Sequence, residues 1–354
     1  MNLAVVDKIA KAVLYEGYML YPYRPSSVKN QQRWNFGVLC PRAYSEVQDG
    51  SEAWLMQTEC LVQGSLLTSL EVRVRFLHLV ARSVGELTMP ATEIVPGAIP
   101  EFRPVEKLEV NGRVYQAWQE AVEREVVVPV CNVEALVQNQ AVHTFAFPSQ
   151  KHFEPLRDSG GQFVGILTLE GNAIAGEVEV SAARHDHGLF AVSVRIRNTT
   201  PFTVATETIR EEALLSSLVS THTVLGVQDG VFVSLLAPPE NLSELASRCK
   251  NVGTWPVLVG DEGQNDTLLS SPIILYDYPQ IAPESAGDLF DGTEIDEILS
   301  LRIMTLTDDE KREMSQSDER ARQMLERTET MPVEQLMKLH GVLRGLRPLN
   351  EEAP

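Results

Sequence analysis

The chain has 354 residues, 44% of them apolar, and a formal net charge of -19 at pH 7. Its length and apolar content suit one large β body with an appendage, or two modest domains. The negative charge argues against nucleic-acid binding, which needs a basic face, and against docking on anionic lipid. Residues 261–354 hold 21 acidic and 9 basic side chains, so most of the excess charge lies in the last quarter.

Cysteine spacing and hydropathy indicate the compartment. Cys40, Cys60, Cys131 and Cys249 are widely and irregularly spaced and match no zinc or CxxC pattern. The opening residues carry charges where a signal peptide needs an apolar run. No stretch of about 18 apolar residues occurs, so we expect no membrane insertion. These features predict a cytoplasmic protein with reduced, buried cysteines.

The chain opens with a predicted short helix followed by an aromatic segment. Residues 3–14 place Val6, Ile9 and two further valines at helical spacing. Residues 15–37, YEGYMLYPYRPSSVKNQQRWNFG, hold six of the 23 aromatic residues, with basic side chains between them. Two prolines exclude a helix there, so the backbone must be extended or looped.

Alternation of apolar and polar residues then predicts strands. In residues 69–81, charged residues alternate with the apolar series Leu70, Val72, Val74 and Phe76, which is typical of a half-buried strand. A proline-rich connection is expected over 89–105. Asn111-Gly112, between two alternating runs, predicts a hairpin with a type I′ turn.

The clearest β region is 162–198, which predicts three consecutive antiparallel strands with tight turns near Gly171 and His187-Gly188. The residues expected to share a face are Phe163, Leu167 and Leu169 in the first strand, Val178 and Val180 in the second, and Val192, Val194 and Ile196 in the third. Another hairpin is expected around Asp229-Gly230.

Residues 254–260 and 271–278 are expected to form two more strands, and helical interruptions are expected near 207–219 and 239–249. Strands at this short spacing favour a mainly β fold, an antiparallel sandwich or barrel, over a βαβ fold. We assign this β-rich body, with its short N-terminal helix, to residues 1–283.

Residues 284–354 form a predicted acidic helical region, which makes the chain α+β overall. Thr307 and Glu310 have the spacing of a capping box. The helix over 307–327 has a thin apolar face, so we expect a solvated arm or one that waits for a partner. Acidic residues gather between Asp288 and Glu297; they could bind a divalent cation or a basic partner, or simply complement a helix N-terminus.

Few residues point to catalysis or metal binding. His185 and His187, two apart on a strand, would share a face and could ligate a metal with a carboxylate, although RHDHG also suits a polar turn. His78 is expected to be a buried structural histidine with satisfied nitrogens, and Cys40 an inert buried thiol. No cofactor is expected.

The aromatic segment is the strongest candidate for a binding site, because Tyr, Trp and Arg side chains are enriched at protein interfaces. The same composition would suit a nucleotide or sugar pocket, or plain packing over the β body. The residues that we assign to partner binding are Tyr18, Tyr21, Tyr23, Arg24, Lys29, Arg33 and Trp34.

Two strings of the chain are distinctive: YEGYMLYPYRPSSVKNQQRWNFGVLCPRAY near the N-terminus, and DLFDGTEIDEILSLRIMTLTDDEKREM with DERARQMLERTE near the C-terminus. Together they resemble a family of uncharacterised proteins encoded among bacterial nickel–iron hydrogenase structural and maturation genes. The resemblance spans both ends of the chain. It implies an accessory role in hydrogenase assembly or function and assigns no residue.

Two functional hypotheses follow. The first is a non-enzymatic accessory or assembly protein that binds a hydrogenase subunit or maturation factor. The second is an enzyme of unrecognised type, with an N-terminal pocket of Tyr, Arg and Lys side chains or a metal held by His185, His187 and acidic residues. The absence of known catalytic motifs favours the first hypothesis.

Overall fold

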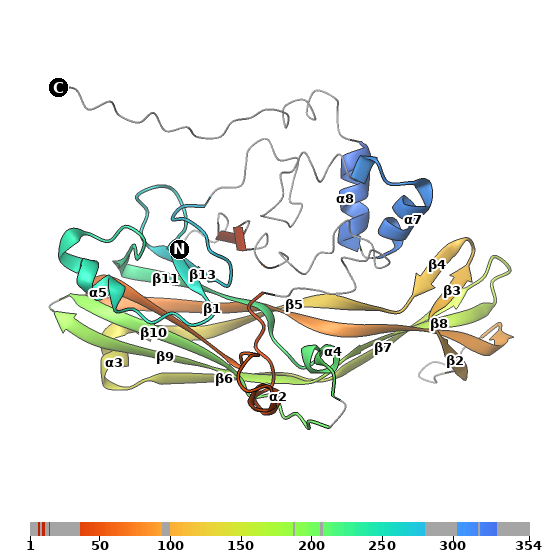
Figure 1. Cartoon of the computed structure of the whole chain (residues 1–354), viewed down its shortest axis with the longest axis horizontal. Coiled ribbons are helices and arrows are strands. Elements are labelled where there is room, and N and C mark those ends of the chain that lie inside the picture. The colour runs from red at the N-terminus through yellow and green to blue at the C-terminus, as the bar shows by residue number, and fades with distance from the viewer. Residues whose placement is uncertain are drawn as a thin grey trace.

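The protein is mainly β, with one large antiparallel sheet and few helices in the part of the chain described by a computed structural model. The described residues are 6–7, 9–10, 14, 36–93, 100–186, 188–205, 208–279, 303–317 and 319–330. Figure 1 shows an elongated molecule in which long strands run along the longest axis and α7 and α8 lie over one side of the sheet.

The strands are β1 (Leu55–Ala91), β2 (Phe102–Val105), β3 (Lys107–Val110), β4 (Arg113–Gln116), β5 (Trp118–Asn132), β6 (Ala141–Phe147), β7 (Gln150–Arg157), β8 (Phe163–Gly171), β9 (Ile174–Asp186), β10 (Leu189–Asn198), β11 (Val219–Val233), β12 (Trp255–Leu258) and β13 (Thr267–Ser271). The helices are α2 (Arg42–Val47), α3 (Val133–Gln138), α4 (Arg210–Leu214), the 3-10 turn η2 (Glu240–Leu242), α5 (Ser243–Ser247), α7 (Asp308–Ser317) and α8 (Glu319–Glu329).

The 37-residue strand β1 organises the sheet. One of its edges pairs in turn with β10, β5 and β2, and the other pairs with β11 and β8, all antiparallel. The main path through the sheet is β12-β13-β11-β1-β10-β9-β6, and β7 pairs with β8. A single strand thus connects both ends of the molecule.

The alternation that predicts a strand over 69–81 is confirmed, because its four apolar side chains are all 0 or 1% exposed. The strand is much longer than predicted. It runs on to Ala91, and β2 pairs back onto it from Val84↔Val105 to Leu87↔Phe102. The connection predicted over 89–105 is therefore wrong at both of its ends. The prolines Pro90 and Pro104 are tolerated because they lie near the ends of the pairing, where a missing N–H costs little.

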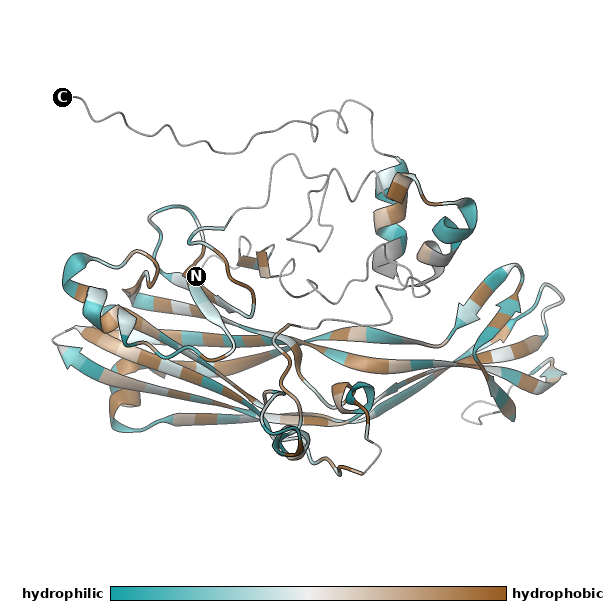
Figure 2. Ribbon diagram, viewed as in Figure 1, coloured by the Kyte–Doolittle hydropathy of each residue, from teal (hydrophilic) through white to brown (hydrophobic). Residues whose placement is uncertain are grey.

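One core cluster joins strands from across the sheet. Buried side chains of β1, β5, β9, β10 and β11 pack together, and rings of β6 pack on them. Phe76 lies 6.1 Å from Phe145 and 5.9 Å from Phe147, measured between ring centroids. Figure 2 shows hydrophobic residues recurring along these strands between hydrophilic ones, as one buried and one wetter face require.

The three strands predicted in 162–198 are present as β8, β9 and β10, but only β9 and β10 pair with each other. The shared faces predicted for β9 and β10 are confirmed, since those five side chains are all buried in one cluster. The face predicted for β8 is wrong. Phe163 packs with Ile166, whereas Leu167 packs with Val84, because the pairing with β1 shifts register between Gly165 and Phe163.

Of the two predicted hairpins, one is confirmed and one is wrong. Asn111 and Gly112 have φ of 54° and 76° between β3 and β4, which confirms a turn with two positive-φ residues. The hairpin predicted at Asp229-Gly230 is wrong, because β11 continues through both residues and stays paired with β1. The register shifts here instead: Asp229, with φ of 55°, lies opposite residues 65–68 of β1, which form a bulge of three extra residues.

The remaining predictions within the body hold in part. The strand predicted at 254–260 is β12, and the predicted helical interruptions contain α4, η2 and α5. The strand predicted at 271–278 is wrong, since the strand here is β13 and residues 272–278 follow it as an irregular segment. Of the predicted N-terminal helix, Val6 and Ile9 are helical and buried, and its other two valines lie outside the described residues.

The C-terminal helices α7 and α8 pack into the molecule. Thr307 and Glu310 form the predicted capping box: the Thr307 amide donates to Glu310 Oε2 at 2.7 Å, and the Glu310 amide donates to Thr307 Oγ1 at 3.3 Å. Met314, Met324 and Leu325 are at most 5% exposed, so the expectation of a solvated arm is wrong for these helices. Residues 280–302 and 331–354, with the acidic cluster between Asp288 and Glu297, lie outside the described residues.

Candidate functional site

All seven residues assigned to partner binding, from Tyr18 to Trp34, lie outside the described residues. The structure does place the residues that flank them. Leu14 is buried with Val38 and Cys40 in one apolar cluster, and Phe36 is 41% exposed. The aromatic segment is therefore anchored at both ends on the same cluster, which also includes Leu77 and Leu79 of β1.

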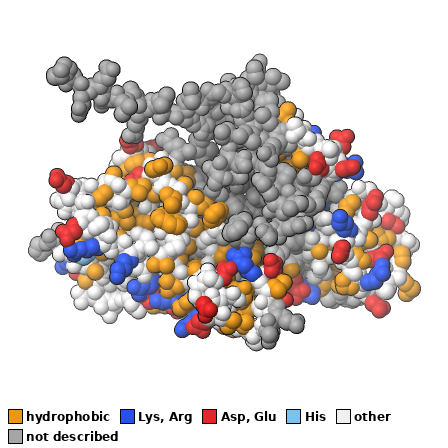
Figure 3. Space-filling view, in the orientation of Figure 1, with side chains coloured by type: hydrophobic (Ala, Val, Ile, Leu, Met, Phe, Trp, Pro, Cys, Tyr) orange, Lys and Arg blue, Asp and Glu red, His pale blue; other side chains and the backbone are white. Residues whose placement is uncertain are grey.

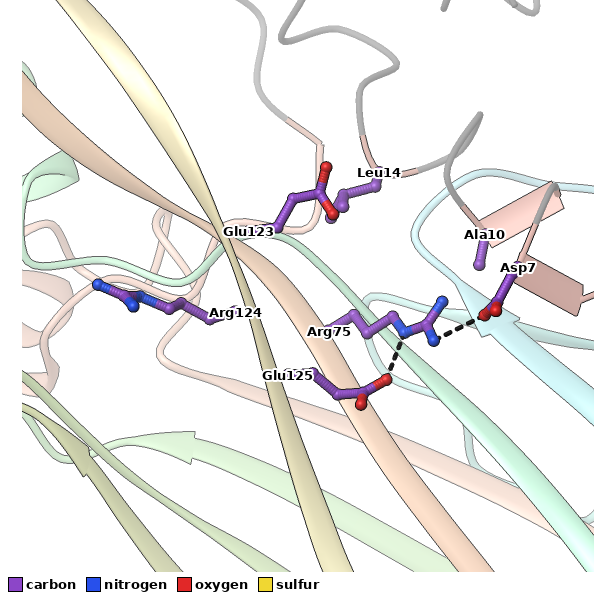
Figure 4. A pocket seen from close by; sticks show the side chains of 7 residues that line it. All are labelled: Asp7, Ala10, Leu14, Arg75, Glu123, Arg124 and Glu125. Atoms are coloured by element: carbon purple, nitrogen blue, oxygen red, sulfur yellow. Dashed lines mark hydrogen bonds and ion pairs between the residues drawn. The ribbon is translucent and has the colours of Figure 1, made fainter. Parts of the chain in front are cut away.

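A cavity of about 290 Å³ lies beside the start of the aromatic segment. Figure 4 shows Arg75 of β1 between Asp7 and Glu125, with Arg124 directed away from that pair. Arg75 Nη2 lies 2.7 Å from Asp7 Oδ1, and its Nε lies 2.7 Å from Glu125 Oε1. Because the guanidinium already has two carboxylate partners, it ties the N-terminal helix to the sheet and is not an open anion-binding group.

A second hollow, of about 320 Å³, lies on the outer face of β9 and β10. Its floor consists of small residues, because Ser181 pairs with Ser193 and Ala183 pairs with Ala191. Next to this floor, long side chains cross the strands and hydrogen bond to one another. Arg195 donates to Gln57 Oε1 at 2.6 Å and to Glu179 Oε1 at 3.1 Å. The hollow thus arises where short side chains follow a row of paired long ones.

The metal site considered for the two histidines receives no support from the residues around His185. His185 lines the second hollow with Glu59, Arg248 and Cys249. Glu59 is engaged by other groups, since its carboxylate accepts hydrogen bonds from Gln57 Nε2 and the Lys250 amide. Among the described residues, no three His, Cys, Asp or Glu side chains gather as metal ligands would, and His187 lies outside them.

The four cysteines are free; Cys40 and Cys60 are buried as predicted, whereas Cys131 and Cys249 are only partly buried. Burial raises the pKa of Cys40 to about 11, and the pKa of Cys60 is raised for the same reason. Burial also raises the pKa of Cys249 to about 11. A reactive thiol needs a lowered pKa, so none of these three is a nucleophile at neutral pH. Cys40 instead donates weakly to Glu52, which pairs with Arg210.

His78 is buried as predicted, at 1% exposure, but its nitrogens are not satisfied. Neither ring nitrogen makes a hydrogen bond of normal geometry within the described chain. Burial, and then the charge of nearby Arg124, lower the pKa of His78 to about 4, against a small opposing effect of the Asn172 backbone. His78 is therefore a neutral ring in the sheet at physiological pH and makes no contribution to an exposed site.

A strongly exposed apolar surface belongs to residues 272–278. Successive side chains alternate: Ile273 and Leu275 pack on the cluster beneath, whereas Ile274 is 71% exposed and Tyr276 86% exposed. Figure 3 shows hydrophobic side chains gathered on this part of the face, over β11 and β13. We call Ile274, Tyr276 and the nearby Leu236, which is 55% exposed, the apolar surface.

Asp277 holds this segment in place. Its Oδ1 accepts from the Leu258 amide at 2.8 Å and its Oδ2 from Ser234 Oγ at 2.5 Å. The Tyr278 amide donates to the Leu258 carbonyl at 2.7 Å. Ser234 Oγ in turn accepts from the amides of Leu236 and Ala237, so the same acid fixes the turn that carries Leu236. The exposed side chains are therefore presented on a fixed backbone.

Sequence reasoning missed this surface because four apolar residues in a row, Pro272 to Leu275, are typical of a strand buried on both faces. The available signal was the aspartate that follows Tyr276. A carboxylate in an extended apolar run can accept the amides of an edge strand, as Asp277 does here, and so replace strand pairing with side-chain hydrogen bonds.

In the part of the chain that the structure describes, no helix combines the length and apolarity that crossing a membrane would require. Comparison of the chain with models of known protein families, and with curated proteins, finds no match.

Proposed function

We propose that this protein is a non-enzymatic accessory or assembly factor that acts by binding another protein. The observation that carries the proposal is the apolar surface, where Ile274 and Tyr276 are largely exposed on a backbone held by Asp277. Fixed, exposed apolar and aromatic side chains are the features of a protein-binding surface, because ordering them costs little on association.

The resemblance stated above supports a hydrogenase subunit or maturation factor as the partner, and the cytoplasm as the place of binding. The aromatic–basic segment, with Tyr21, Arg24 and Trp34, is the second contact in this proposal. Its ends are anchored on the β body, so a partner could engage it and the sheet together. We also infer a sandwich-like body and an acidic helical C-terminal region, which the large core cluster shared by many strands and the α7–α8 pair support.

The test is recovery of partners by the tagged protein from its native host under hydrogenase-inducing conditions, with mass spectrometry of the recovered proteins. We expect the double variant Ile274→Ser/Tyr276→Ser to lose the specific partner while it melts like wild type. The matched control is Met89→Ser, another apolar side chain that is 78% exposed, which should keep the partner. Equal recovery by the double variant and wild type would contradict the proposal.

The aromatic segment is tested in the same experiment with Trp34→Ala, Tyr21→Ala and Arg24→Glu. An interface anchor of this type contributes about 2 kcal/mol or more to binding. We expect Arg24→Glu and at least one ring truncation to abolish recovery of the partner with little change in melting temperature. Unfolding of both ring variants, with normal recovery by Arg24→Glu, would show that the segment is only packing.

A further inference from the structure

Edge strands expose unpaired N–H and C=O groups, and proteins usually protect them with charge, proline or bulges. Most described edges of this sheet are protected. β7 contains Lys151, Glu154 and Pro155, β12 contains Pro256, and β2 contains Pro104. β5 carries acidic and basic side chains and a proline along its length. These strands are poor templates for pairing with another chain.

Strand β6 is the exception. Its sequence, AVHTFAF, contains no proline and no Asp, Glu, Lys or Arg. It pairs with β9 over all seven residues without a register shift, and the described residues supply no strand on its other side. No residue of β6 is buried, and Figure 1 shows the strand at the margin of the sheet away from α7 and α8. A straight, uncharged edge is thus open to a partner strand.

The residues of β6 complement each other about Thr144. An antiparallel copy centred there would place Ala141 opposite Phe147, Val142 opposite Ala146 and His143 opposite Phe145. In each pair the larger side chain faces a smaller or flatter one, and no like charges meet, as favourable cross-strand pairing requires. In this register the core-facing side of one β6 also continues into the core-facing side of the other, so both phenylalanines stay on the core side.

We propose that β6 pairs antiparallel with β6 of a second copy of this chain, about a two-fold axis at Thr144, and joins two sheets into one. The net charge of the chain does not oppose this pairing locally. The nearest acid, Glu177, is paired with Arg197 at 2.7 Å. Its equivalent in the second copy would lie three strand spacings away, roughly 14 Å, beyond the screening length of about 8 Å in physiological salt.

The expected dimer is weak and depends on concentration. Pairing of two seven-residue strands alone covers less than the roughly 1,200 Å² typical of stable interfaces. The main-chain hydrogen bonds supply the affinity, as in other cases of strand addition. The inference is independent of the proposed function, because it uses no residue of the apolar surface or the aromatic segment.

Sedimentation equilibrium over a range of concentrations tests the proposal. We expect wild type to approach twice the mass of the chain as concentration rises, and Thr144→Lys to remain monomeric, because two ammonium groups would then face each other at the axis. The control is His152→Lys, which adds the same charge to an exposed position on β7 and should dimerise like wild type. A monomeric wild type, or a dimeric Thr144→Lys, overturns the proposal.

Cross-linking gives a second readout that does not depend on how Thr144→Lys folds. A cysteine at position 144 would lie about 5 Å from its equivalent across the axis, measured between Cβ atoms. We therefore expect Thr144→Cys to form a covalent dimer with a short bifunctional thiol reagent, and His152→Cys to remain monomeric under the same conditions. Equal cross-linking of both variants would overturn the proposal.

Discussion

At the scale of single residues, two histidines are among the most deeply buried titratable groups of the described chain. His78 and His222 are 1% and 0% exposed, and burial lowers the pKa of each from 6.5 to about 4. His222 shares a hydrogen bond of 3.0 Å with the Ser220 carbonyl through Nδ1, which assigns the proton to that nitrogen in the neutral ring. His78 has no such bond.

Both histidines should make the fold sensitive to acid. Between pH 6.5 and about 4, each of these histidines is protonated in the unfolded chain but neutral in the folded protein. The free energy of unfolding therefore falls as the pH falls through this range. A drop in pKa from 6.5 to about 4 corresponds to roughly 3 kcal/mol for each ring, at about 1.4 kcal/mol per pKa unit.

We predict that His78→Leu makes this loss of stability shallower, because leucine fills the site without a proton and gives up no normal hydrogen bond. Urea unfolding at several pH values between 7 and 4 measures the effect. Between pH 7 and pH 4, the free energy of unfolding should fall less in the variant than in wild type. His152→Leu, at an exposed position, is the control and should follow wild type. Parallel curves for His78→Leu and wild type would show that the buried ring does not resist protonation.

At the scale of elements, hydrogen bonds and strand pairing decide whether a segment with the sequence pattern of a strand or turn forms that element. Residues 271–278 carry the pattern of a strand, yet Asp277 takes the amide of Leu258 and the segment becomes an irregular support for Tyr276. Asp229-Gly230 has the composition of a hairpin turn, yet β11 continues through it past a bulge, without reversing direction. In that case the same partner, β1, lies beside both halves, and no chain reversal is possible.

We predict that Asp277→Ala lowers the free energy of unfolding by about 1–3 kcal/mol, because it leaves the buried Leu258 amide without its acceptor. Hydrogen exchange at that amide should speed up, and recovery of the binding partner should fall as the apolar surface loses its support. Asp261→Ala, at an exposed position in the neighbouring loop, should change neither quantity. Unchanged exchange at Leu258 in Asp277→Ala would show that this acid does not hold the segment.

At the scale of the whole molecule, the strands supply most of the side chains of the main hydrophobic core. The largest cluster draws most of its side chains from β1, β5, β9, β10 and β11, with a few from α3, β12 and β13, and none of them comes from α7 or α8. The buried residues of those helices, Met314, Met324 and Leu325, lie outside that cluster. The β body thus has a core that does not depend on the C-terminal helices.

We therefore predict that removal of residues 306–354 leaves a folded β body with a cooperative melting transition. The melting temperature should fall, because β4 loses its contacts with α7. The helical component of the circular dichroism spectrum should decrease, because α7 and α8 are removed, and the strand signal should remain. Loss of the cooperative transition would show that the helices are part of the folding unit.

The sequence by itself determined the local pattern of the protein. Alternation identified β1 over 69–81 and the buried faces of β9 and β10, the Asn111-Gly112 pair identified a hairpin, and Thr307 with Glu310 identified a helix start. These features can be predicted from the spacing and identity of residues that are near neighbours in the chain, so a local pattern is sufficient to identify them.

Only the tertiary structure decided which strands pair and which apolar side chains remain exposed to solvent. Nothing local in β8 distinguishes β9 from β1 as its partner, and nothing in Pro272–Leu275 says which of its apolar faces is covered. The exposure of Tyr276 follows from a bond between Asp277 and Leu258, and the open edge of β6 follows from its place last in the sheet. Such outcomes depend on residues distant in sequence, whose positions only the complete fold determines.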